Sequence, residues 1–66
     1  MDTIMILANA LQKAAGINME ISRLDIQYNT KTESYSARLW LVHNTSGVTF
    51  KYDIHEDGSV ERLLKA

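Results

Sequence analysis

Residues 34–55 read SYSARLWLVHNTSGVTFKYDIH, and two alternating patterns in this stretch decide the fold. Apolar side chains occupy every second position from Tyr35 to Leu41 and again from Val48 to Ile54. Side chains two residues apart in a β-strand point to the same side, so each run describes a strand with one apolar and one polar face. The pattern is typical of an antiparallel sheet that is covered on one side only.

The segment before this stretch predicts a further strand, which begins at about Met19 and ends at about Tyr28. Its apolar alternation changes parity between Ile21 and Leu24. A β-bulge near residues 22–23 would bring both halves onto one face, because one extra residue inverts the sides. Alternatively, the residues before the change belong to a linker and close one end of the core.

Two flanking segments complete the predicted order of elements. Residues 4–15 contain no glycine or proline, and their apolar side chains at helical spacing predict a helix to about Ala15, with Gly16 as a left-handed cap. Residues 59–66 fit either a fourth strand or a helix. The Asp-Gly turn signal at residues 57–58 favours the strand, whereas intrinsic propensity favours the helix. We predict the strand.

This order predicts one α+β domain over residues 1–66, in which an N-terminal helix packs on one face of a three- to four-stranded antiparallel sheet. Short connections between the strands make sequential strands neighbours in that sheet. The apolar positions predict a core that consists of Ile4, Leu7, Leu11, Leu24, Ile26, Leu39, Leu41, Val48, Phe50 and Ile54.

Composition limits the classes of function. Seven basic and eight acidic residues are scattered along the chain and give a formal charge of −1, so overall charge does not favour nucleic-acid binding. The chain has no cysteine, which excludes disulfides and thiolate metal sites. The apolar start is too short to span a bilayer and lacks the positive region of a signal peptide. We therefore expect a cytoplasmic protein without membrane contact.

Chain length bears on oligomeric state. A domain of 66 residues buries a modest core, which supplies a net stability of only about 3–5 kcal/mol. Without disulfides or a metal, a second copy of the chain is the most natural further support. A homodimer is therefore one expectation for this protein.

Trp40 is the strongest candidate for a binding residue. It lies between Leu39 and Leu41, so strand alternation turns Trp40 and Val42 toward the polar face. A large aromatic with a branched neighbour in a ring of charge resembles an interface anchor with a polar rim. Alternatively, Trp40 packs beneath the C-terminal segment against Leu63. The pattern places around Trp40 on this face Arg23, Asp25, Gln27, Arg38, Thr49, Lys51, Asp53 and His55. The predicted partner-binding residues are Trp40, Val42, Arg38, Lys51, Asp53 and His55.

The remaining polar residues form no recognised catalytic or metal-binding pattern. The two histidines, His43 and His55, fall on opposite faces of the predicted sheet, which argues against a catalytic pair. Residues 53–58 imitate the opening of a calcium loop, but the third position is His55 and the twelfth, which needs a bidentate glutamate, is Leu64. We expect no enzymatic activity, no cofactor, no metal and no small-molecule substrate.

Three hypotheses of function follow. The leading one is a small non-enzymatic module that binds another protein, or a second copy of itself, through the sheet face centred on Trp40; inhibitors, adaptors and phage-type accessory factors are examples of this class. The second is a sheet-based nucleic-acid-binding protein, in which Arg38 and Lys51 flank the indole. The third is a structural homodimer with no other partner surface.

Overall fold

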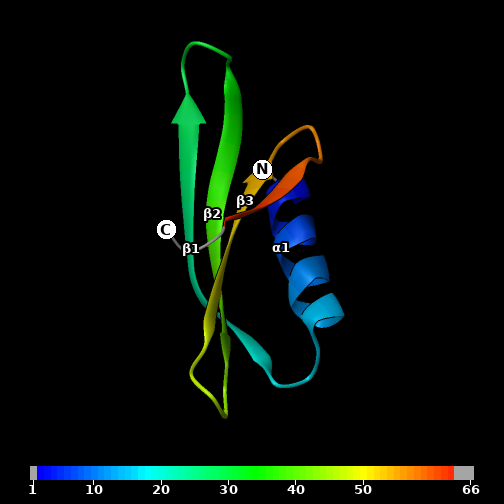
Figure 1. Ribbon diagram of the computed structural model, residues 1–66. Helices are drawn as coiled ribbons and strands as arrows, with labels where there is room; N and C mark the ends of the chain where they lie inside the picture. The colour runs from blue at the N-terminus through cyan, green and yellow to red at the C-terminus, as the bar shows by residue number, and fades with distance from the viewer. Residues whose placement is uncertain (1, 64–66) are drawn as a thin grey trace.

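The computed structural model describes residues 2–63, which form one helix and four strands (Figure 1). The elements are α1 (Asp2–Ala15), β1 (Met19–Asn29), β2 (Ser34–His43), β3 (Thr49–His55) and β4 (Val60–Leu63). The α+β class and the order of elements are those that the sequence predicts. The chain after the Asp-Gly turn is a strand, so the helical alternative for this segment is wrong as far as Leu63.

The four strands form one antiparallel sheet in the order β1-β2-β3-β4. Each strand pairs with its neighbour in sequence, as short connections require. At the centre of the sheet, Leu39 of β2 lies opposite Leu24 of β1 and Tyr52 of β3. The three apolar faces therefore lie on the same side of the sheet.

The change of parity in β1 is a β-bulge. Ile21 pairs with Leu41 and Arg23 pairs with Trp40, so Ser22 is an extra residue without a partner in β2. The bulge lets Met19, before it, and Leu24, after it, face the same side. Met19 is 5% exposed and belongs to the core. The alternative interpretation, in which the residues before the parity change form a linker, is wrong.

The helix α1 covers the apolar face of the sheet (Figure 1). Its residues Ile4 and Ala8 are buried against a sheet layer that contains Leu39, Leu41 and Ile54. These contacts account for the helical spacing of the apolar residues in the sequence. In the described part of the chain, α1 falls short of the length and apolar character that a membrane-spanning helix needs.

The connection from α1 to β1 is fixed by backbone geometry and one side chain. Gly16 has a φ of 117°, a left-handed conformation that residues with a Cβ rarely adopt, and this ends the helix. The side-chain amide of Gln12 then donates a hydrogen bond of 2.8 Å to the carbonyl oxygen of Met19. The predicted glycine cap is confirmed.

Two residues of the predicted core lie outside it. Ile26 is 36% exposed and Val48 is 50% exposed, whereas the other predicted core residues are buried or pack against the buried cluster. A helix of 14 residues is about 21 Å long. A strand of 11 residues is about 36 Å long, so the helix cannot cover both ends of the sheet. Ile26 lies in one cross-strand row with Ala37 and Ile54, which are 3% and 0% exposed, so its exposure results from its position on the edge strand β1. Figure 1 shows the hairpin of β1 and β2 extending beyond the helix.

Candidate functional site

The face of the sheet opposite α1, called here the outer face, carries all six predicted partner-binding residues. Because Leu39 and Leu41 turn toward α1, the alternate residues of β2 turn away from it. Strand pairing then fixes their neighbours. On the outer face Trp40 lies opposite Lys51, Arg38 opposite Asp53, Ser36 opposite His55 and Val42 opposite Thr49.

Trp40 is half-buried at the middle of the outer face. The guanidinium carbon of Arg23, its partner on β1, lies 5.1 Å from the centre of the indole ring, a cation–π contact. Lys51 lies on its other side in β3. Part of the indole remains accessible to solvent, and both of its cross-strand neighbours are cationic.

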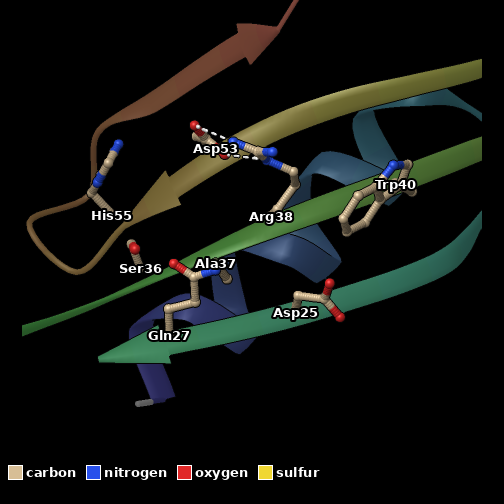
Figure 2. A pocket seen from close by; sticks show the side chains of 8 residues that line it. All are labelled: Asp25, Gln27, Ser36, Ala37, Arg38, Trp40, Asp53 and His55. Atoms are coloured by element: carbon tan, nitrogen blue, oxygen red, sulfur yellow. Dashed lines mark hydrogen bonds and ion pairs between the residues drawn. The ribbon is translucent and has the colours of Figure 1, made fainter. Parts of the chain in front are cut away.

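A hollow of about 170 Å³ lies beside the indole on the outer face (Figure 2). Four predicted partner-binding residues, Trp40, Arg38, Asp53 and His55, line it, whereas Val42 and Lys51 lie on the same face outside it. We call this depression the Trp40 hollow. Its complete lining consists of Asp25, Gln27, Ser36, Ala37, Arg38, Trp40, Asp53 and His55.

Ser36 and Ala37 line the Trp40 hollow but are not among the outer-face residues predicted from the sequence. Ser36 shares the parity of Arg38 and Trp40, so the alternation of β2 was a sufficient signal for it. Ala37 is 3% exposed and faces the core, yet it also lines the hollow. Side-chain parity assigns such a residue to the core and gives no signal for its place in the hollow.

Ion pairs set the charge of the outer face. Arg38 Nε donates to Asp53 Oδ1 at 3.0 Å, and a longer contact of 3.5 Å joins Arg38 Nη2 to Asp53 Oδ2. The hydrogen bond to Asp53 and the attraction of its charge raise the pKa of Arg38, and Asp25 adds a smaller effect in the same direction. Arg23 forms a second pair with Asp25 at 3.0 Å. Each arginine of this surface is therefore matched by a carboxylate.

The side chains of two hairpin turns have structural partners. His43 Nδ1 accepts a hydrogen bond of 3.2 Å from the backbone N–H of Ser46, and Asp57 Oδ1 accepts hydrogen bonds from the backbone and the hydroxyl of Ser59. The bonds from Ser59 lower the pKa of Asp57. Glu56 accepts a hydrogen bond of 2.9 Å from the backbone N–H of Tyr35.

Two further points from the sequence concern metal ligation and the alternative in which Trp40 packs beneath the C-terminal segment against Leu63. Within residues 2–63, no three side chains of histidine, aspartate or glutamate are placed to hold a metal ion. Leu63 pairs with Lys51 and so lies in the same cross-strand row of the outer face as Trp40. The rest of the segment that would cover the indole, residues 64–66, lies outside the described residues, as does the twelfth position of the calcium-loop pattern.

Comparison of the chain with family models, with curated proteins and with solved structures finds no significant match. Function must therefore be inferred from the geometry of the chain itself.

Proposed function

We propose that this protein is a non-enzymatic protein-interaction module that binds its partner through the outer face, with Trp40 as the anchor. The observation that carries the proposal is the position of the only tryptophan. It lies half-buried at the centre of a sheet face that α1 leaves uncovered, beside the Trp40 hollow. Tryptophan is enriched among the residues that contribute most to binding energy, and such residues cluster near the centres of interfaces.

The surroundings of the indole specify the chemistry of the partner. Val42 follows Trp40 on the same face, so an apolar side chain of the partner can pack against both. Around them, arginine–carboxylate pairs present charges of both signs in fixed positions. This arrangement fits a partner surface that has one apolar side chain at its centre, with acidic groups around it that face the arginines and basic groups that face the carboxylates.

The same ion pairs favour a protein over a nucleic acid. A phosphate that approached Arg38 or Arg23 would have to compete with Asp53 or Asp25, which lie on the same face. These carboxylates also repel phosphate directly. Nucleic-acid binding gains most of its affinity from unpaired basic residues, and Lys51 alone of the three outer-face cations has no carboxylate within ion-pair distance among the described residues.

The proposal predicts the effect of truncating the indole. Trp40→Ala should weaken partner binding by about 2 kcal/mol or more, because an anchor loses its packing against the partner. Affinity capture from the native cells with the wild-type protein and this variant should identify the partners that depend on Trp40. Titration calorimetry with the purified partner then measures the loss of affinity.

A control variant separates this effect from a general loss of apolar surface. Val48 is 50% exposed and precedes β3 outside the outer-face cluster, so Val48→Ala should retain the partner. Circular dichroism must show that both variants are folded. If a folded Trp40→Ala protein captures the same partners with unchanged affinity, the outer face is not the binding surface.

A further inference from the structure

The free edge of β1 is the longest uncovered strand edge in the described sheet. β1 spans 11 residues and pairs only with β2, so its other edge presents backbone N–H and C=O groups without strand partners. On the side that faces α1, this strand also exposes Ile21, Ile26 and Tyr28, which are 39%, 36% and 51% accessible. An edge with an apolar margin favours the addition of another strand.

We infer that this edge joins a second copy of the same chain, so that two β1 strands pair antiparallel about a two-fold axis at Ile26. The inference concerns the backbone edge of β1, which borders the outer face at Asp25 and Gln27, and it does not depend on the proposed function. The resulting dimer has one continuous eight-stranded sheet, with both helices on the same face. The Trp40 hollow of each copy stays open on the opposite face.

The sequence of β1 selects this register. The bulge at Ser22 limits regular pairing to residues 23–29, and a two-fold axis at Ile26 uses all of them. On the α1 side it places Ile26 opposite Ile26 and Leu24 opposite Tyr28 of the other copy. On the outer side it places Asp25 opposite Gln27, so that a carboxylate faces an amide donor and like charges are not opposed.

Neighbouring symmetric registers are less favourable. An axis at Asp25 brings two carboxylates directly opposite each other, which is destabilising in a cross-strand pair. An axis at Leu24 places Ile26 opposite Ser22, where the bulge interrupts the ladder. An axis at Gln27 also avoids opposed charges, but it shortens the ladder within the strand to residues 25–29, whereas the axis at Ile26 pairs all of residues 23–29.

Association can be measured with the wild-type chain. Sedimentation equilibrium should detect a dimer, and the melting temperature should rise with protein concentration. A protein that sediments only as a monomer at about 100 μM, where an association with a Kd of that value would be half formed, overturns the inference.

Two substitutions at one position test the edge and the register together. In Gln27→Lys, the lysine of each copy lies opposite Asp25 of the other copy, and the two ion pairs should tighten the dimer several-fold. In Gln27→Asp, the new carboxylate of each copy lies opposite Asp25 of the other copy, and the two repulsive pairs should weaken the dimer by about 10-fold. Gln27 is exposed, so neither substitution changes the core, and circular dichroism checks the fold of each variant. Equal dimer affinities for the two variants would place the interface elsewhere.

The absence of cysteine permits a direct distance measurement. Single spin labels introduced through Leu24→Cys, Ile26→Cys and Tyr28→Cys should give the shortest distance between copies at position 26. Labels at positions 24 and 28 should both be farther apart, by about 14 Å along the strand direction. A shortest distance at position 24 or 28 contradicts the register.

Discussion

At the scale of single residues, Asp57 shows how one side chain holds a turn of this small domain. Its Oδ1 accepts hydrogen bonds of 2.9 Å from the backbone N–H and 2.7 Å from the hydroxyl of Ser59. Aspartate in this position mimics a backbone turn and presets the geometry of the hairpin between β3 and β4. Gly58, with a φ of 95°, provides the left-handed conformation within that turn.

These bonds predict a dependence of stability on pH. Because they lower the pKa of Asp57 in the folded state, its contribution to stability is complete above the unfolded pKa of about 3.9. The contribution is lost as the pH falls through the lower folded pKa. Asp57→Asn keeps an oxygen acceptor but has no charge, so it should lower the melting temperature near neutral pH and lose this difference in acid.

Thermal unfolding of both proteins between about pH 2 and pH 7 checks this expectation. Ser59→Ala is the matched control, since it removes one donor and retains the other; it should fall between the wild type and the Asp57→Asn variant at neutral pH. Parallel pH profiles for the wild type and Asp57→Asn would show that the carboxylate charge does not stabilise the turn.

At the scale of elements, the strands were predictable and their coverage by the helix was not. Alternation in β2 and β3 and the parity change in β1 were sufficient to place three strands, because each depends only on residues close in sequence. The exposure of Val48 depends on the length of α1 relative to the strands. The exposure of Ile26 depends on its position on the edge strand β1, beside the buried Ala37 and Ile54, and side-chain parity contains neither kind of information. The choice of strand for β4 depended on the Asp-Gly turn alone.

The bulge leads to an unusual prediction for a deletion. Since Ser22 has no partner in β2, its removal leaves a continuous alternation from Met19 to Leu24 and keeps every cross-strand pair. The deletion should change the free energy of unfolding by no more than about 1 kcal/mol, in the range of an exposed surface change.

Deletion of Asp25 is the matched control, because it removes one residue from the regular part of the same strand. This deletion turns each residue of β1 before position 25 to the other side of the sheet, so Met19, which is 5% exposed, moves out of the core. We expect a cost of about 2–5 kcal/mol, comparable to the whole stability of a core this small. Urea denaturation measures both variants, and a larger loss for the Ser22 deletion would contradict the role of the bulge.

At the scale of the whole molecule, the sequence predicts which residues lie on the outer face, but it predicts only in part which charged residues form ion pairs there. Parity alone placed Trp40, Arg38, Asp53 and His55 on one face, and they line one hollow. Parity cannot show that Arg38 turns to Asp53, because that choice depends on side-chain rotamers in three dimensions.

This balance of charge, with a net charge of −1, predicts that the chain has little affinity for nucleic acid. Fluorescence anisotropy with labelled single-stranded and double-stranded RNA at physiological salt should show no specific binding. Binding of the protein partner should change little with salt, whereas a phosphate-based contact weakens steeply as salt increases. A steep salt dependence would favour the nucleic-acid alternative.

The chain contains one tryptophan, and its ring lies under the guanidinium of Arg23 on an accessible face. All of its indole emission therefore originates at the surface proposed for recognition. Occupation of that surface would remove water from the ring and shift the emission to shorter wavelength, so the unlabelled protein reports its own complex formation in a simple optical titration.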